Sequence, residues 1–368
     1  MPKALVSIII PTFNYAPYLP NLFRNLQAQT YKDLEVIVVD DGSTDDTKTL
    51  VQTNCPKATY IYQENQGLSA ARNTGIRAAH GEYLIFLDAD DFLAPNVVSS
   101  QVANLETHPN LDLSICLALG TFIQDSKAQS FIWPLMADNF DLHLCCTNIN
   151  PVHSFCLRHA KIDLVGFFKK DRHLEDYDFW LRCAEMGLNF ATNITAAVFY
   201  NKHADSLLHA GQKQLKQTIA LRQELRHCLE TKPNFPKAGK LCGWLAYLAG
   251  CVKEIHNYPD TPEIADFWQE IAIAQENISL YAPTINHLGQ YYALEALNAW
   301  QLLAAKAKTR CPNLPTLMAK FLPDLTNFSE LKRLLKNHKL TLCCDDQAMR
   351  QTAQAAVLWL NHFLFATK

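Results

Sequence analysis

The chain has 368 residues, with 33 Lys or Arg against 36 Asp or Glu, so its formal net charge is −3. A balance so close to neutral argues against a protein that coats nucleic acid, and we expect no nucleic-acid partner. Hydrophobic residues make up 49% of the sequence, enough to fill the cores of two or three domains.

The cysteines and the N-terminus indicate a reducing compartment. The 12 cysteines are scattered and show no Cys/His cluster with the spacing of a zinc site. No secretory signal is visible, and the most apolar helical stretch, Leu241 to Val252, is shorter than the roughly 20 residues that a membrane span needs. We therefore expect a cytoplasmic protein without a transmembrane segment, with peripheral contact at the inner face of the membrane left open.

Apolar runs alternate with helical patterns through the first half of the chain. Two runs predict buried strands, at residues 6–10 (stopped by Pro11) and 34–39, and a third apolar run follows at 58–62, with helices at 19–29 and 47–52 between them. This alternation predicts an α/β fold with a mainly parallel mixed sheet. Further along, Pro151 to Arg158 is predicted as an edge strand and Ala196 to Tyr200 as the last strand. No Gly-x-Gly-x-x-Gly follows the first strand, which argues against a dinucleotide-binding dehydrogenase.

Three carboxylates follow another apolar run, Tyr83 to Leu87. Asp88, Asp90 and Asp91 are expected at the carboxyl end of a strand, where open α/β sheets bind ligands. Their mutual repulsion calls for a counter-charge, and hard cations such as Mg²⁺ and Mn²⁺ bind a few carboxylates together with substrate phosphates. An Asp often caps a helix instead, and we interpret Asp91 as a helix-start residue.

Charged residues draw attention at three further places. Arg72 lies where a loop runs into a helix, so it either pairs with an acid or phosphate or is a surface arginine. Glu175 and Asp176 come at the start of a predicted helix, where the helix dipole favours ionised carboxylates. Capping would explain one of the two acids, but several acidic and basic residues among aromatic ones suggest a further role. His203 follows the last strand, a position where a histidine is more often a surface residue than a ligand.

Five segments in order resemble the motifs of the family 2 inverting glycosyltransferases of the GT-A fold. They are Ser7 to Asn14 (SIIIPTFN), Val38 to Asp45 (VVDDGSTD), Gly67 to Gly75 (GLSAARNTG), Phe86 to Phe92 (FLDADDF) and Glu175 to Arg182 (EDYDFWLR). Each match alone is weak, but five in order are a strong signal. The resemblance covers residues 5 to about 207 and implies a GT-A nucleotide-sugar-binding domain over residues 1–208.

The resemblance implies a donor-nucleotide site built from Pro11, Thr12, Phe13, Asn14, Asp41, Arg72, Asp88 and Ala89. Within this set, Phe13 would face the base and Asp41 would accept hydrogen bonds from it. Asp88 would reach the ribose or the water shell of a metal.

The resemblance also implies the metal site and the catalytic acids. Asp90 would bind Mn²⁺ or Mg²⁺ at the diphosphate, and His203 would lie there as a further ligand. Asp176 would be the general base, with Glu175 beside it orienting the acceptor or the base.

These roles imply inverting transfer of a hexosyl or N-acetylhexosaminyl group from a nucleotide sugar, a UDP-sugar by first expectation, to a glycan or lipid-linked acceptor. The Gln-x-x-Arg-Trp element of processive synthases is missing, so we expect addition of one or a few sugars. A non-catalytic glycosyltransferase-like module is one alternative, although the intact acids argue against it. A nucleotidyltransferase is another, but its Gly- and Arg/Lys-rich phosphate loop is not seen.

The last part of the chain has a helical pattern. Apolar stripes predict helices at residues 241–255, after Thr261-Pro262, and at 286–308, 329–337 and 345–365. We expect an all-α domain over residues 209–368 that contacts the acceptor, a second copy in a homo-oligomer, or another partner. Its basic stretch Leu331 to Lys339 is interpreted as a solvated helix face in preference to a membrane-docking one.

Overall fold

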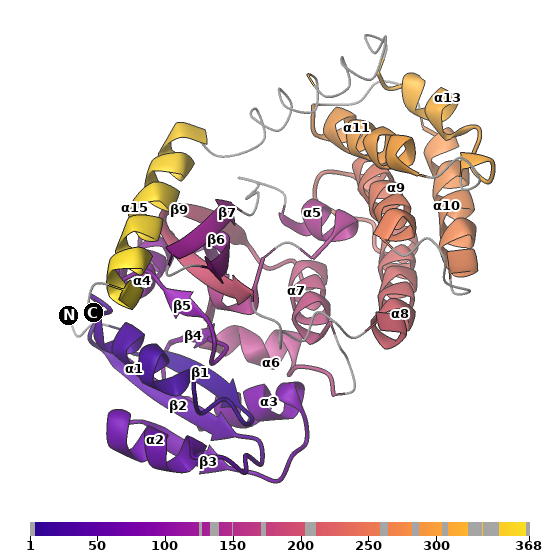
Figure 1. Cartoon of the computed structure of the whole chain (residues 1–368). Helices are drawn as coiled ribbons and strands as arrows, with labels where there is room; N and C mark the ends of the chain where they lie inside the picture. Colours follow the sequence, from indigo (N-terminus) through magenta and orange to yellow (C-terminus); the bar gives the residue numbers. More distant parts are fainter. Residues whose placement is uncertain are drawn as a thin grey trace. The chain divides into compact units, whose positions relative to one another are not determined.

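The computed structural model describes residues 4–124, 127–132, 140–148, 150–170, 174–202, 211–257, 264–281, 287–303, 308–322, 333 and 346–365. The chain divides into two compact units, which Figure 1 draws together. The sheet unit comprises Met1–Leu135, Asn150–Leu208 and Asp345–Lys368. The helical unit comprises Met136–Ile149 and His209–Cys344.

The sheet unit contains, among its described residues, a nine-stranded sheet with the order β3-β2-β1-β4-β8-β6-β9-β5, with β7 paired to β6. The strands are β1 (Val6–Thr12), β2 (Leu34–Asp40), β3 (Thr59–Tyr62), β4 (Tyr83–Phe86), β5 (Phe92–Leu93), β6 (Leu113–Gln124), β7 (Lys127–Ile132), β8 (Phe155–Arg158) and β9 (Phe190–Lys202). The strands β3, β2, β1 and β4 are parallel, as are β6 and β9. The prediction of a mainly parallel mixed sheet in an α/β fold is confirmed.

Helices connect these strands and cover the sheet. They are α1 (Leu19–Gln27), α2 (Thr47–Asn54), α3 (Leu68–Ala78), α4 (Val97–Thr107), α6 (Ile162–Val165), α7 (Glu175–Glu185) and α15 (Asp346–Phe365), with 3-10 turns η1 (Val152–Ser154) and η2 (His159–Lys161). Each parallel crossover in the first half carries a helix, as α3 does between β3 and β4 where it packs on β1. The carboxyl ends of β1, β2 and β4 consequently meet at one edge of the sheet.

Two strand predictions are wrong, each for a reason visible in the pairing. First, β1 does not stop at Pro11. The backbone polar groups of Ile9 and Pro11 face β4, and the carbonyl of Ile9 accepts the N–H of Leu87. Pairing of β1 with β4 ends at Ile9, two residues before Pro11. No ladder N–H is needed there, so the strand continues to Thr12.

The second wrong prediction concerns β8, which is not an edge strand. It lies between β4 and β6 and is antiparallel to both. Its consecutive residues Phe155, Cys156 and Leu157 are all buried, so both faces of the strand are covered. Such an unbroken apolar run is typical of a strand inside a sheet.

The helical unit is organised around α9 (Lys240–Asn257). Its neighbours are α5 (Phe140–Cys146), α8 (Gly211–Thr231), α10 (Ile264–Ser279) and α11 (His287–Leu302), and α13 (Leu314–Ala319) packs against α10 and α11. The apolar stripe predicted for this stretch is buried, including Leu245, Leu248 and Val252. The helical character expected of this region is confirmed, and no helix among the described residues has the length and apolarity to cross a membrane.

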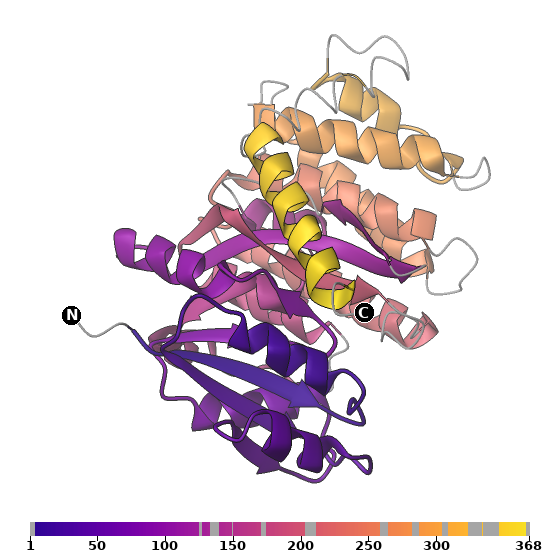
Figure 2. The same cartoon turned by 60° about the vertical axis from the view of Figure 1, so that its left-hand side comes forward.

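The unit boundaries differ from a division at residue 209 in two places. Residues 136–149, with α5, group with the helices, and the C-terminal helix α15 groups with the sheet. Figure 2 shows α15, in yellow, lying across strands of the sheet unit, and it contacts β9, β7 and β6. Trp359 stacks on Phe199 of β9, and Leu360 is fully buried. An amphipathic pattern predicts a helix but does not identify the surface that buries it. The segments at 258–263 and 329–339, where further helical features were predicted, lie outside the described residues apart from residue 333.

The packing of α15 predicts different results for two leucines that lie two positions apart. Leu360→Ala is expected to lower the thermal midpoint of the full chain, because deleting a fully buried leucine costs about 2–5 kcal/mol. Leu358 is 72% exposed, so Leu358→Ala should change stability by no more than about 0.5 kcal/mol. Equal shifts in the two variants, measured by differential scanning calorimetry, would contradict the packing of this helix on the sheet.

Candidate active site

The carboxyl ends of β1 and β2 are tied together and present an aromatic ring. The N–H of Asp41 donates to the carbonyl of Thr12 at 2.9 Å, and Asn14, with a φ of 56°, accepts the N–H of Thr44 on its side chain at 2.8 Å. Phe13, between them, remains 44% exposed. The buried hydroxyl of Thr12 makes no hydrogen bond with the described part of the chain. These strand ends thus offer a flat ring and a hydroxyl to a ligand.

The carboxylate of Asp41 is engaged with the protein itself. One oxygen accepts from the side chain of Gln63 at 2.6 Å and from the N–H of Gln66 at 2.9 Å, and the other accepts from the N–H of Gly67 at 2.8 Å. Asp41 therefore fixes the loop that leads into α3. Because a carboxylate has about four acceptor positions, these bonds leave capacity for one from a ligand.

Arg72 on α3 forms the central connection of the site. Its Nη2 lies 2.8 Å from Oδ1 of Asp88, and its Nη1 lies 2.6 Å from Oε1 of Glu175. Burial opposes the charge, but the carboxylates of Asp88 and Glu175 raise the pKa of Arg72 above its usual value, so the guanidinium stays charged. Arg72 is 1% exposed, which excludes the alternative of a surface arginine. The cation joins the turn after β4 to the first residue of α7.

The α7 acids have different surroundings. Burial raises the pKa of Glu175 to about 7, against the attraction of Arg72 and with a contribution from the negative charge of Asp176. Asp176 is half-buried and accepts the N–H of Tyr177 at 2.7 Å. Asp178 is buried between Arg182 and Lys169, each 2.9 Å away. Asp178 therefore secures the helix, whereas Asp176 borders the surface beside the Arg72 bridge.

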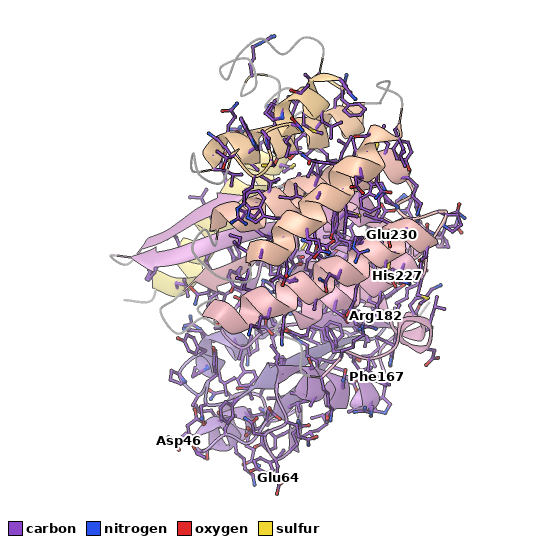
Figure 3. The ribbon with its side chains drawn as sticks, turned by 90° about the vertical axis from the view of Figure 1, so that its right-hand side faces the viewer. Asp46, Glu64, Phe167, Arg182, His227 and Glu230 are labelled. Atoms are coloured by element: carbon purple, nitrogen blue, oxygen red, sulfur yellow. The ribbon has the colours of Figure 1, made fainter. Side chains whose placement is uncertain are left out.

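The segment before α7 is held against α3. The side chain of Asn73 exchanges two hydrogen bonds with the backbone of Phe168, at 2.8 and 2.9 Å. Arg182 donates to the carbonyls of Val165 and Phe167. Both Arg182 and Phe167 are labelled in Figure 3. These bonds fix the start of α7 relative to Arg72.

The turn after β4 carries the remaining predicted acids. The N–H of Asp91 donates to the carbonyl of Asp88 at 3.2 Å, which closes a turn with Ala89 buried and Asp90 half-buried. Asp91 itself is buried, accepts the N–H of Asn201 at 2.8 Å and lies 3.0 Å from Nδ1 of His153. The prediction that Asp91 starts a helix is wrong, because β5 follows it and α4 begins only at Val97. Its partners come from distant segments that local sequence cannot indicate.

Two tyrosines beside these acids were not predicted as site residues. Burial and the charges of Asp90, Asp88 and Asp91 raise the pKa of Tyr15. Burial raises the pKa of Tyr200, and so do the charges of Asp91, Asp88, Asp90 and Asp176. Both phenols therefore stay protonated. The charges of Asp176 and of the Asp88–Asp91 turn both act on Tyr200. The residues next to a tyrosine in or near an apolar strand do not indicate that its side chain will lie beside distant acids.

The carboxylates suit a hard cation that a substrate helps to bind. Among the described residues, no group of three or more His, Cys, Asp or Glu side chains could hold a metal ion. The turn offers the carboxylates of Asp88 and Asp90, with one Asp88 oxygen held by Arg72. Mg²⁺ commonly binds through one or two carboxylates and completes its shell with water and substrate phosphates, so this donor set fits. His203 lies outside the described residues.

A surface hollow of about 520 Å³ lies elsewhere in the sheet unit and does not contain these residues. It is lined by residues near the end of α3 and around α6, among them Arg77, Glu82, Arg158, His159 and Phe167. The Arg158 guanidinium is already bound to the carbonyls of Leu105 and Leu111. The convergence of acids around Arg72, rather than the hollow, marks the candidate active site.

Comparison with known proteins relates the fold and residues 7–161 to a known class. The fold resembles that of Staphylococcus aureus TarS, whose residues 1–349 were solved with UDP-GlcNAc, with a TM-score of 0.57, 16% identity and 92% of each chain covered. The family model for Glycosyl transferase family 2 matches residues 7–161. The chain thus carries a glycosyltransferase family 2 domain. The matched range includes Arg72, Asp88 and Asp90 and ends before Glu175.

Curated relatives match the same part of the chain. An uncharacterized glycosyltransferase of Rickettsia typhi is 34% identical over 184 residues, which are 48% of this chain and 58% of that protein. Chondroitin synthase of Escherichia coli is 32% identical over 194 residues, 50% of this chain and 27% of that protein. The chain therefore spans less than two thirds of the length of these relatives.

The Arg72 bridge predicts a large difference between two arginines of α3. Arg72→Gln is expected to destabilise the protein by about 3–5 kcal/mol, because it leaves the buried Glu175 and the half-buried Asp88 without their counter-charge. Arg77 is exposed and packs its guanidinium 4.7 Å from the ring centre of Phe167, so Arg77→Gln should cost about 1 kcal/mol or less. Urea denaturation of the two variants tests this. Similar losses would mean that Arg72 is not the counter-charge on which the acids depend.

Proposed function

We propose that this chain transfers a hexosyl or N-acetylhexosaminyl group from a UDP-sugar to a hydroxyl of a glycan or lipid-linked acceptor, with inversion at the anomeric carbon. The observation that carries the proposal is the bridge formed by Arg72, a residue within the range that the family 2 model matches. It holds Asp88, in the turn proposed to bind the donor, and Glu175, next to the proposed base Asp176. The fold likeness to TarS, solved with UDP-GlcNAc, supports the choice of a UDP-sugar.

Donor binding is assigned to the strand ends and the turn after β4. The exposed ring of Phe13 would stack on the base, and the remaining acceptor position of Asp41 would receive a hydrogen bond from it. Pro11, Thr12 and Asn14 would shape this pocket, while Asp88 and Ala89 would approach the ribose.

Asp90 would hold Mn²⁺ or Mg²⁺, with Asp88 nearby and His203 as a further candidate. When bound, such a cation neutralises the charge that develops on the departing diphosphate. Asp90 is half-buried in the turn after β4, and a cation held there would complete its shell with phosphate oxygens of the donor.

Proton transfer is assigned to α7. An acceptor hydroxyl has a very high pKa, so a carboxylate must take its proton as the oxygen attacks the anomeric carbon. Asp176 is half-buried beside the bridge and lies at the N-terminus of a helix, which favours an ionised carboxylate. Glu175, held by Arg72, would orient Asp176 and the acceptor. A single in-line displacement then inverts the anomeric carbon.

The helical unit is proposed to contact the acceptor, a second copy of the chain or another partner. We further propose that the protein adds one or a few sugars and acts in the cytoplasm or at the inner face of the membrane. Incubation of the purified protein with UDP-sugars, Mn²⁺ and glycan acceptors, followed by measurement of UDP release and product mass, tests the function. Binding without any transfer would favour a non-catalytic module.

Asp176→Asn should separate catalysis from binding. The amide cannot accept the proton, so transfer should fall by about 10²–10⁴-fold, whereas UDP binding measured by calorimetry should survive. Asp163→Asn, an exposed Asp of α6, is the matched control and should keep full activity. Normal turnover of Asp176→Asn would remove Asp176 from the role of base.

Asp90→Ala should instead weaken the binding of UDP in the presence of Mn²⁺. We expect a loss of about tenfold or more, equivalent to about 1.4 kcal/mol, because the cation loses its protein ligand. The control is Asp46→Ala, which removes an exposed carboxylate labelled in Figure 3. Calorimetric titration of UDP with and without Mn²⁺ measures both. An unchanged Mn²⁺ dependence in Asp90→Ala would exclude Asp90 as the ligand.

A further inference from the structure

A buried polar contact lies directly behind the turn that carries Asp88 and Asp90. The side chains of Asp91 and His153 are almost completely buried, at 1% and 0% exposure. Oδ2 of Asp91 lies 3.0 Å from Nδ1 of His153, the distance of an ion pair, although the two atoms do not meet the geometry of a regular hydrogen bond. Oδ1 of Asp91 accepts the N–H of Asn201 at 2.8 Å. One carboxylate therefore joins three segments: the turn after β4, the η1 turn before β8, and the end of β9.

These contacts fix both ends of the short segment that holds Asp90. At its start, the N–H of Leu87 donates to the carbonyl of Ile9 at 2.9 Å. At its end, the N–H of Asp91 closes the turn on Asp88, and the side chain of Asp91 is anchored by Asn201 and His153. Asp90 lies between the two anchors. A shift at Asp91 would therefore move the Asp90 carboxylate.

His153 is a side-chain partner of the buried Asp91 carboxylate. A buried carboxylate that loses a hydrogen-bond donor costs free energy and tends to seek another partner. Asn201 supplies a backbone N–H that no side-chain substitution removes, so His153 is the partner of Asp91 that a substitution can replace. The second ring nitrogen of His153, Nε2, is buried and has no hydrogen-bond partner in the described part of the chain. The contact with Asp91 is thus the principal polar interaction of the imidazole.

We propose that His153 is a positioning residue for the donor site, which holds the Asp88–Asp91 turn in place through Asp91 and so sets the position of the Asp90 carboxylate. The inference rests on the proposed function for the role of Asp90. His153 itself touches neither donor nor acceptor, and it acts through Asp91.

The test compares two replacements of His153. His153→Leu replaces the imidazole with an apolar side chain that cannot pair with Asp91. It should weaken UDP binding in the presence of Mn²⁺ by about 10- to 100-fold, as loss of an orienting partner behind a metal ligand commonly does. The KM for the donor should rise while kcat changes much less. His153→Asn places an amide nitrogen close to the position of Nδ1 and should restore most of the affinity.

A matched control is His159→Leu. His159 lies a few residues further on, and its Nδ1 is 2.9 Å from the carbonyl of Gly81, away from the turn. This variant should leave the affinity for UDP and the KM for the donor unchanged. Thermal unfolding of each variant shows whether it is folded, and His153→Asn provides the comparison if His153→Leu does not fold.

The outcomes decide the proposal independently of catalysis. If folded His153→Leu binds UDP with Mn²⁺ as the wild type does, the positioning role is overturned. It is also overturned if His153→Asn loses as much affinity as His153→Leu, or, should His153→Leu not fold, if His153→Asn loses about tenfold or more. If the wild type binds UDP with Mn²⁺ but transfers no sugar, the proposed function fails while the binding comparison still tests His153. If the wild type shows no Mn²⁺-dependent UDP binding, both proposals fall.

Discussion

The buried guanidinium of Arg72 is the interaction on which the geometry of the site depends. Removing a charge from water costs several kcal/mol, and attraction to opposite charges in the interior offsets this cost only when the partners are well placed. Here the partners are carboxylates from two distant segments, Asp88 after β4 and Glu175 at the start of α7. Because neither acid can move without leaving a buried charge unpaired, the turn and the helix are held in a fixed relation. An aromatic cluster of Phe86, Phe168 and Phe179 packs behind this bridge.

The sheet supplies the second constraint. Parallel pairing brings the carboxyl ends of β1, β2 and β4 to one edge, so residues far apart in sequence become neighbours. The insertion of β8 as an antiparallel strand places η1, and with it His153, behind the turn after β4. The long strand β9 then brings Asn201 and Tyr200 to the same place. Buried polar contacts thus support the turn that carries Asp88 and Asp90.

The C-terminal helix shows that chain order and unit membership differ. After the residues of the helical unit, α15 returns to the sheet unit and covers part of β9 with Trp359 and Leu360. Its far end contacts α1, where Arg24 donates to the carbonyl of Phe363 and lies 4.7 Å from the centre of its ring. The sheet unit therefore includes a helix that follows the helical unit in sequence.

Local sequence predicted most of the helices and strands and the acids after β4. The buried runs of β1 and β2, the apolar stripe of α9 and the acids after β4 follow from the identity and spacing of neighbouring residues, which set propensity, periodicity and charge. The resemblance to family 2 motifs directed attention to Phe13, Asp41, Arg72 and the α7 acids. What local sequence could not supply was the partner of each group.

Tertiary structure alone decided which residues meet. It placed Asp91 against His153 and Asn201 rather than at a helix start, put β8 inside the sheet, and engaged Asp41 with its own loop. It also gave α15 to the sheet unit. Each of these outcomes depends on long-range burial and hydrogen bonding, since a buried polar group or apolar face must find a partner wherever the folded chain provides one. Periodicity and composition describe what a segment needs to bury, and only the folded chain determines what buries it.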